Sequence, residues 1–323
     1  MASADTVSEA PDTAEPARRG GLSAWFNRNG WKQTVIAVPF TWLFLFFFVP
    51  FVIVIAMSIA VRTETSPPFS FIGEFPFVNT ASALRLFEDS LYIRAFLTSI
   101  WNASIATFLC LLIGYPMALG LTRVSKGWRN ILLMLVVLPF WTSFLLRIYA
   151  WIGLMGANSW LNRLLTGIYN LVSPDAPLHH IQMMNTNFAV ILVTVYCYLP
   201  FMVLPLYANL EKLDLTLNEA AMDLGSKPFQ VFLDVTLPLS IPGIIAGGLL
   251  VFIPASGELV IPSLVGSASD PMIGRVISDE FASARDWPMA ATVAVALLVL
   301  LVGPTMLYNH FEARAQAAAE PKP

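Results

Sequence analysis

The sequence predicts an all-α membrane protein with six transmembrane helices. Hydrophobic residues make up 57% of its 323 residues and charged residues only 12%, and the mean hydropathy is +0.69. Soluble domains carry roughly 25% charged residues. Long segments without Asp, Glu, Lys or Arg also recur along the chain, and a bilayer core about 30 Å thick needs roughly 20 helical residues. Because backbone polar groups in lipid must be satisfied internally, runs of this length favour helices over a barrel.

The six helices are expected where these uncharged runs fall. Their ranges are 33–61, 95–122, 130–154, 187–210, 238–257 and 287–311. The third uncharged run is the shortest, and it reaches a spanning length if Arg147 snorkels towards the membrane surface. Residues 1–32 are rich in Ala, Pro, Gly, Ser and charge, which predicts a disordered cytoplasmic tail. Residues 313–323 predict a second cytoplasmic tail, so the membrane domain is expected over 33–312.

The composition excludes several kinds of site. The chain contains no Gly-Lys dipeptide, so it lacks the phosphate-binding loop of a nucleotide hydrolase. Its two cysteines, Cys110 and Cys197, both fall inside apolar runs, and its three histidines form no zinc-binding spacing. The net charge of −3 gives no basic excess for a nucleic-acid partner. We therefore expect no catalytic residue, no metal site and no cofactor. We expect the helices to be surrounded by membrane lipid.

Lys and Arg in the short flanks of the helices predict the orientation in the membrane. With the N-terminus in the cytoplasm, the cytoplasmic segments hold eleven of these residues and the outer segments six. The cytoplasmic residues are Arg18, Arg19, Arg28, Lys32, Arg123, Lys126, Arg129, Lys212, Lys227, Arg314 and Lys322. The outer residues are Arg62, Arg85, Arg94, Arg163, Arg275 and Arg285. We therefore expect a multi-pass protein of the inner (plasma) membrane. Both termini and the loop at 211–237 are expected in the cytoplasm.

A polar segment within this loop predicts a short helix. Thr216 with Glu219 three residues later has the form of a capping box at a helix start. Gly225 suits the left-handed residue that ends a helix. A helix of about two turns is not stable alone in water, so neighbouring helices or a partner surface must hold it. Its two adjacent alanines, Ala220 and Ala221, allow another backbone to approach closely.

Two charges stand alone in apolar surroundings. Arg147 lies in the third predicted helix, and Glu258 follows the fifth. A charge within a spanning helix costs roughly 2.5–3.5 kcal/mol on insertion scales, so both are expected to face the bundle interior or water. The functional interpretation is a lining of a transport pathway, and the structural alternative is an ion pair between the two or snorkelling at the helix ends. The aromatic residues Trp141, Tyr149 and Trp151 line the same pathway or anchor the chain at the membrane interface.

The loop segment resembles a known motif. Glu-Ala-Ala, then Asp-Leu-Gly after one residue and Leu-Pro farther on, resembles the EAA loop of permease subunits in ABC importers. The matching residues are Glu219, Ala220, Ala221, Asp223, Gly225, Leu237 and Pro238. In that family the loop docks into a groove of the ATPase subunit, so the resemblance implies an ATPase-coupling role for the residues at 219–225. In a soluble protein the same pattern is more simply an ordinary surface helix, and the membrane context favours docking.

Further segments narrow the resemblance. They are Phe140-Trp141-Thr142-Ser143, Arg147-Ile148-Tyr149-Ala150-Trp151, Gly257-Glu258 with Val260-Ile261-Pro262, and Met272-Ile273-Gly274. These look like the permease subunits of spermidine/putrescine importers, and the similarity covers roughly residues 35–315. Two departures concern the substrate more than the class: Leu259 replaces a usual aromatic residue, and Gly266-Ser267 replaces a Gly-Gly pair.

The resemblance implies a type I ABC importer permease that moves spermidine or putrescine by alternating access. It implies three kinds of partner: a dimer of ATP-binding subunits that hydrolyse ATP, a second permease subunit, and an extracytoplasmic substrate-binding protein. The second permease is either another gene product or another copy of this chain. Two alternatives stay open. One is an importer permease for another small solute, such as sulfate, iron, phosphonate or an amino-acid derivative, and the other is a secondary transporter or channel acting alone.

Overall fold

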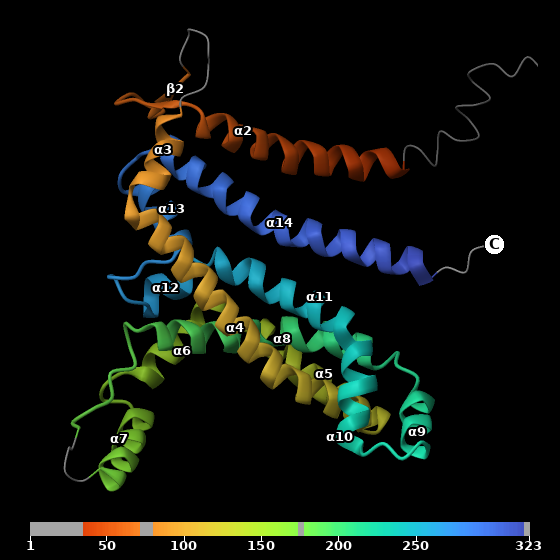
Figure 1. Ribbon diagram of the computed structural model, residues 1–323. Coiled ribbons are helices and arrows are strands. Elements are labelled where there is room, and N and C mark those ends of the chain that lie inside the picture. Colours follow the sequence, from red (N-terminus) through yellow and green to blue (C-terminus); the bar gives the residue numbers. More distant parts are fainter. Residues whose placement is uncertain (1–34, 72–79, 174–177, 320–323) are drawn as a thin grey trace, which may run out of the picture. The chain divides into compact units, whose positions relative to one another are not determined.

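The computed structural model describes residues 35–71, 80–173 and 178–319 (Figure 1). The chain divides into two units between Ile53 and Val54. One apolar helix, described from Val35, passes through the π-helical turn η1 (Phe44–Phe48) into α2 (Val49–Ser58), and the boundary between the units falls inside α2. The tail expected over 1–32 lies outside the described residues. The elements after α2 all belong to the second unit.

The second unit begins with a short hairpin and two consecutive helices. They are β1 (Val61–Arg62), β2 (Phe69–Ser70), α3 (Ala81–Glu88) and α4 (Ser90–Arg123). The two strands pair antiparallel, with Val61 opposite Ser70. Asp89 separates the helices because its backbone is extended, and its carboxylate accepts the Leu91 N–H at 2.9 Å as the cap of α4. The helix expected from residue 95 therefore begins five residues earlier.

The single helix expected over 130–154 is wrong. The chain forms α5 (Lys126–Val137), the 3₁₀ turn η2 (Leu138–Trp141), α6 (Phe144–Met155) and α7 (Trp160–Val172). The two helical arms, 126–141 and 144–172, are bent by 90°. The cause is local. Pro139 in η2 lacks an N–H to continue an α-helix, and Thr142 is extended with a φ of −98° and a ψ of 150°.

The next spanning helix has the predicted bounds. It is α8 (Asn187–Leu210), and Thr186 caps it by accepting the Ala189 N–H at 3.2 Å. The following segment contains α9 (Leu215–Asp223), α10 (Pro228–Val231), the π-helical η3 (Phe232–Thr236) and α11 (Leu237–Ser256). The last elements are α12 (Val260–Val265), α13 (Ile273–Ala282) and α14 (Trp287–Ala319). The backbone of α14 stays helical well into the range expected as a C-terminal tail.

The described helices agree with six membrane segments. Four are long and apolar enough to cross a membrane: Val35–Ser58, Ser90–Arg123, Asn187–Leu210 and Pro228–Ser256. The bent pair of arms makes a fifth segment, and the apolar part of α14, Trp287–Gly303, makes a sixth, shorter one. The all-α membrane fold predicted from the sequence is therefore confirmed, with a broken third segment.

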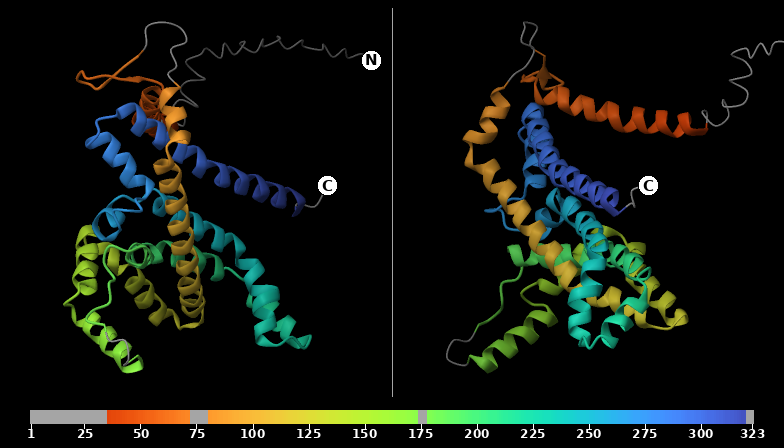
Figure 2. Two further views of the ribbon diagram at one scale, coloured as in Figure 1. Left: turned by 60° about the vertical axis from the view of Figure 1, so that its left-hand side comes forward. Right: turned by 45° about the vertical axis from the view of Figure 1, so that its right-hand side comes forward.

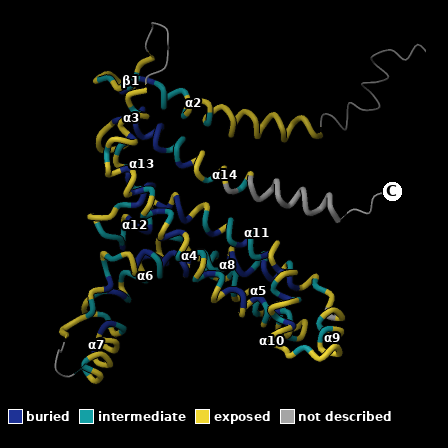
Figure 3. Tube along the Cα trace, in the orientation of Figure 1, coloured by how far each residue is buried: buried dark blue, intermediate teal, exposed yellow. Residues whose placement is uncertain are grey.

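The core of the second unit forms where α4, α8 and α11 lie side by side, as both views of Figure 2 show. The tube in Figure 3 is darkest, and so most buried, around these three helices. Gly243 and Gly247 of α11 face α8. A Cβ on Gly247 would lie 2.8 Å from the Met202 Sδ, and one on Gly243 would lie 2.7 Å from the Asn209 Cβ. These two glycines therefore allow close packing of α11 against α8.

Two arginines fasten the hairpin and α3 to the start of α14. Asp286 is buried, and its carboxylate lies 3.6 Å from the Arg62 guanidinium and 3.2 Å from that of Arg85. The Arg62 guanidinium also donates to the Ala284 carbonyl at 3.0 Å. These ion pairs join segments about two hundred residues apart in the chain, and so they position the loop between α13 and α14.

We predict that the close approach of α11 to α8 makes Gly247→Ala destabilising by about 1–3 kcal/mol, as for other overpacked cores. The neighbouring Gly248→Ala is the matched control, because its Cβ would meet only the Thr107 Cγ2, at 3.8 Å. Alanine also favours a helix over glycine. Thermal unfolding of the purified chain in detergent measures both variants. Equal unfolding temperatures for the two would contradict the packing role of Gly247.

Candidate functional site

The candidate coupling helix is α9, and it begins earlier than predicted. Asp214 is its N-cap, and its carboxylate accepts the Thr216 N–H at 3.0 Å. This hydrogen bond is the main cause that lowers the pKa of Asp214 below its ordinary value, so the cap is ionised at neutral pH. The capping box expected from Thr216 and Glu219 is wrong, because Thr216 already lies inside the helix. The carboxylate of Glu219 is therefore exposed rather than used as a cap.

The end of α9 is the one predicted from the sequence. Gly225 has a φ of +90°, in the left-handed region. Its N–H donates to the Met222 carbonyl at 2.9 Å, and the Ser226 N–H donates to the Ala221 carbonyl at 3.1 Å. This pair of bonds is a Schellman motif, which satisfies the last carbonyls of the helix. No atom lies within 4 Å of a Cβ built on Gly225, so backbone conformation and not space requires the glycine.

One side of α9 is held by the chain and the other is exposed. Asn218 is half-buried, and its side-chain carbonyl accepts the Thr236 hydroxyl at 3.3 Å, which ties α9 to η3. Glu219, Ala220 and Asp223 are exposed, and Ala221 is half-buried. Sequence reasoning missed two neighbouring apolar residues, Leu224 and Phe229, which are 89% and 70% exposed. These large exposed apolar side chains lie at the end of α9 and the start of α10, and exposed apolar groups of this kind are typical of a surface that contacts a protein partner.

A second cluster surrounds Glu258, in the turn between α11 and α12. The residue is only 9% exposed. One carboxylate oxygen accepts the Val260 N–H at 2.9 Å and the Ile261 N–H at 3.5 Å, at the start of α12. The other accepts the Tyr198 hydroxyl of α8 at 2.5 Å. The buried charge is thus fully hydrogen-bonded, which is the condition for holding a carboxylate at such a place.

The glycine of a distant motif packs directly against this turn. A Cβ on Gly274 would lie 2.5 Å from the Gly257 carbonyl oxygen and 2.7 Å from that of Glu258. The start of α13 therefore touches the backbone that carries Glu258. The Ile273 N–H also donates to the Ser99 hydroxyl at 2.7 Å, which fixes α13 against α4. Two motifs that are separate in the sequence, 257–262 and 272–274, thus form one structural unit.

Arg147 does not form the ion pair considered in the sequence analysis. Among the described residues, no carboxylate oxygen lies within 4.0 Å of its guanidinium, that of Glu258 included. The guanidinium carbon instead lies 5.7 Å from the ring centre of Phe140 and 5.5 Å from that of Phe144. Such cation–π contacts compensate part of the cost of burying the charge.

The rings around Arg147 continue towards Glu258. Phe140 lies 5.0 Å from Phe201 of α8 between ring centres, and Phe201 lies 5.9 Å from Tyr198. Tyr198 in turn binds Glu258. An aromatic path therefore joins the two lone charges, and Tyr198 and Phe201 were not identified from the sequence. The sequence around Tyr198 does not indicate its role, because its partner Glu258 lies sixty residues later in the chain.

The other expected pathway residues are distributed around α6. Trp151 is half-buried and lies 5.5 Å from Tyr196 between ring centres. Arg147, Trp151 and Tyr196 line one cavity of about 380 Å³. Trp141 and Tyr149 are 72% and 55% exposed and are not among the residues that line it. The structure thus brings Arg147 and Trp151 together and leaves Trp141 and Tyr149 facing outwards.

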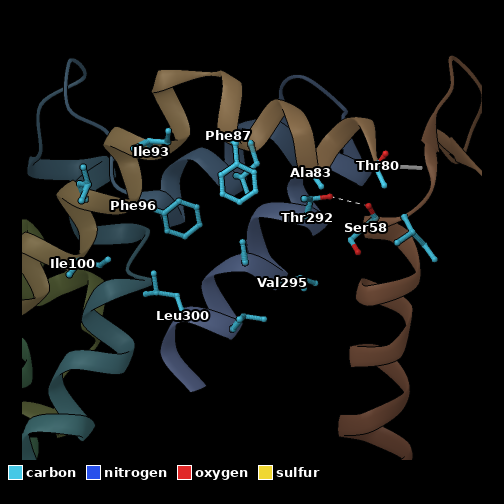
Figure 4. A pocket seen from close by; sticks show the side chains of 15 residues that line it. Ser58, Thr80, Ala83, Phe87, Ile93, Phe96, Ile100, Thr292, Val295 and Leu300 are labelled. Carbon is cyan, nitrogen blue, oxygen red and sulfur yellow. Dashed lines mark hydrogen bonds between the residues drawn. The ribbon is translucent and has the colours of Figure 1, made fainter. Parts of the chain in front are cut away.

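A different cavity, of about 650 Å³, lies between α3, α4 and α14 (Figure 4). Its walls are almost entirely apolar, with side chains such as Phe87, Phe96 and Leu300. Its few polar groups stand near Ser58, where the Thr292 hydroxyl donates to the Ser58 carbonyl at 3.0 Å. No charged side chain lines this cavity. It therefore offers no group that distinguishes a charged solute, unlike the region around Glu258.

Comparisons with known proteins show the family to which this chain is similar. The family model described as binding-protein-dependent transport system inner membrane component matches residues 110–316. The spermidine/putrescine transport system permease protein PotB of Haemophilus influenzae is 41% identical over 273 residues, 84% of this chain and 91% of that protein. The PotB protein of Escherichia coli is 39% identical over 260 residues, 80% of this chain and 90% of that protein.

The fold is also found among solved structures. A chain of the bacterial alginate ABC transporter, in complex with an alginate pentasaccharide-bound periplasmic protein, superposes with a TM-score of 0.64. It is 17% identical, and the match covers 91% of this chain and 98% of that chain. The family match spans more than half of the chain, and the PotB relatives match over most of their length. The chain therefore belongs to the family of inner membrane components of binding-protein-dependent transport systems.

Proposed function

We propose that this chain is the transmembrane permease subunit of an ATP-driven importer of polyamines such as spermidine and putrescine. The observation that carries the proposal is the 41% identity to a spermidine/putrescine permease over 84% of the chain. The membrane domain covers 33–312, and ATP is hydrolysed in a partner subunit, because the sequence has no phosphate-binding loop. The partners are a dimer of ATP-binding subunits, a second permease and an extracytoplasmic binding protein.

The loop over 211–237 couples the permease to the ATPase subunits. Its exposed surface combines the carboxylate of Glu219 with the apolar side chains of Leu224 and Phe229. An apolar centre beside a charged group is typical of protein interfaces. The distribution of Lys and Arg, eleven against six, supports the cytoplasmic side for this loop and for both termini. An ATPase in the cytoplasm reaches α9 in that orientation.

The residues around Glu258 form the cation-selective part of the pathway. A polyamine carries several positive charges, so crossing an apolar bundle requires acidic or aromatic groups that offset lost hydration. Glu258 supplies a carboxylate, and Tyr198 and Phe201 of α8 supply rings next to it. Arg147, Trp151, Trp141 and Tyr149 belong to the surroundings of this pathway on α6 and η2.

The decisive experiment is uptake into membrane vesicles that contain this chain with its ATP-binding subunits, second permease and binding protein. We expect labelled spermidine or putrescine to enter only with ATP. Uptake without ATP would support a secondary transporter acting alone. If a complex imports sulfate or another solute with ATP and does not import a polyamine, the chain is still an importer permease, but the proposed polyamine substrate is wrong. A bacterial ABC transporter with this fold takes part in the import of the acidic polysaccharide alginate, so the fold itself does not select for cations.

The left-handed end of α9 makes Gly225 essential for coupling. A non-glycine residue there costs about 1–2 kcal/mol and shifts the exposed residues of α9. We expect Gly225→Val to lower ATP-dependent uptake several-fold at normal abundance. Gly225→Asn should be milder, because asparagine tolerates this backbone region. Gly127→Val is the control, since Gly127 has no positive φ and no atom within 4 Å of a built Cβ. Normal uptake by Gly225→Val would contradict the role of α9 in coupling the permease to the ATPase.

The exposed carboxylate of Glu219 is free to pair with a basic residue of the ATPase subunit, because Asp214 caps α9. Glu219→Gln keeps the size and removes the charge, so we expect weaker ATPase binding at low salt and a smaller difference at high salt. Affinity of the purified subunits at two salt concentrations measures this effect. Glu64→Gln, an exposed acid after β1, is the control. An identical affinity for Glu219→Gln and the original chain at low salt contradicts the pairing.

Glu258→Gln should lower polyamine uptake by about tenfold or more, since hydrogen bonds to charged groups are worth about 1.5–3 kcal/mol. The loss should appear as weaker polyamine transport while the complex still assembles. Tyr198→Phe separates charge from structure, because it removes the hydroxyl bonded to Glu258 and leaves the carboxylate. We expect Tyr198→Phe to retain more uptake than Glu258→Gln. Unchanged uptake in Glu258→Gln would refute the cation pathway.

A further inference from the structure

Arg147 is a buried cation, and two of its nitrogen atoms have no acceptor in the part of the chain that the structure describes. The residue is 9% exposed, and its Nε and Nη1 atoms are shielded from solvent and have no hydrogen-bond partner among the described residues. Removing one member of a buried ion pair is strongly destabilising, because the remaining charge is uncompensated. We therefore expect Arg147 to bind an acceptor that a partner of this chain supplies.

The contacts of Arg147 with described residues are cation–π contacts, which supply no hydrogen-bond acceptor. The rings of Phe140 and Phe144 lie against the guanidinium at 5.7 and 5.5 Å. The N–H groups point in the plane of the guanidinium, where a ring face offers no acceptor. Arg147 also lines the cavity of about 380 Å³ described above, whose walls are mostly apolar. Since Nε and Nη1 are shielded from solvent, an acceptor that enters this cavity meets the guanidinium first at Nη2.

The surface beside this cavity is apolar and uncovered. Leu146 is 65% exposed and Tyr149 is 55% exposed, and Leu146 also lines the cavity. A charged residue of a membrane segment faces protein or water rather than lipid. Water is an unfavourable neighbour for the exposed apolar side chain of Leu146. We therefore expect protein to cover this side of α6 and to bring the missing acceptor.

We infer that a carboxylate of the second permease subunit enters this cavity and forms an ion pair with Arg147. The inference rests on the proposed function, which supplies that subunit. A carboxylate matches the planar fork of a guanidinium with two parallel hydrogen bonds. A polyamine substrate cannot take its place, because its ammonium groups are donors and carry the same charge as Arg147. The ion pair also neutralises a cation that otherwise repels the substrate near Glu258.

The experiment uses the whole complex, solubilised in detergent and purified through a tag on this chain. Arg147→Met keeps a long apolar stem and removes the charge. We expect the equilibrium retention of the second permease to fall by about a hundredfold or more, as for other broken buried pairs. Arg163→Met, at an exposed arginine on α7, is the matched control and should retain the second permease like the original chain.

Changing each Asp and Glu in the membrane segments of the second permease to Asn or Gln identifies the partner. One such change should cause the same loss by itself and restore retention when combined with Arg147→Met. The inference is overturned if Arg147→Met retains the second permease normally, or if no acid of that subunit is coupled to it. It is also overturned if Glu74→Gln or Asp175→Asn in this chain, both outside the described residues, restores Arg147→Met instead.

The wild-type complex distinguishes this inference from the proposed function. If the complex imports polyamine with ATP and Arg147→Met leaves assembly intact, only the ion pair is rejected. If the original chain retains no second permease at all, the proposed assembly is rejected and the ion pair with it.

Discussion

The close contact of α11 with α8 is the constraint on which the rest of the second unit depends. Gly243 and Gly247 allow the two backbones to meet, and any side chain there would strike Asn209 or Met202. Helices in a membrane gain no hydrophobic free energy by leaving lipid for each other, so such close packing is a main source of association. A hydrogen bond between the Tyr115 and Ser240 hydroxyls, at 2.9 Å, adds α4 to the same contact.

Because α11 is fixed against α8, both of its ends are positioned. At its first end, Thr236 of η3 binds Asn218 of the candidate coupling helix. At its last end, the chain turns at Gly257 and presents Glu258 to Tyr198 of α8. The two candidate sites are thus carried by one helix and braced by the same neighbour. Neither site needs a long loop to hold it in place, which suits groups whose geometry matters for function.

Sequence patterns predicted those elements whose cause is local. The bounds of α8 follow from a capping threonine before the helix and charged residues after it. The end of α9 at Gly225 was predictable because a left-handed backbone favours glycine. The break after Pro139 was missed because hydropathy continues through it while the backbone does not. The start of α9 was misplaced because Asp214 and Thr216 are both good caps, and only the hydrogen bond at 3.0 Å decides between them.

Contacts between residues far apart in the chain could not be predicted from the sequence, for a different reason. Glu258 and Arg147 looked alike as lone charges, and pairing them was the simplest way to satisfy both. The structure treats them differently: Glu258 receives three hydrogen bonds from its own chain, whereas Arg147 receives only aromatic contacts. No pattern of residue types distinguishes these outcomes, because they depend on which distant side chains the fold brings near.

The π-helical turn η3 gives the link between the two sites a physical basis. A π-helical turn inserts an irregular step into the backbone ladder, and such turns are frequent at functional positions. Here the step lies between α10 and α11, directly beside the contact of Thr236 with α9. Under the proposed coupling role, a partner that displaces α9 acts on this turn first and on α11 next. Since α11 ends at the turn that carries Glu258, the proposed coupling surface and the carboxylate are joined by this one helix.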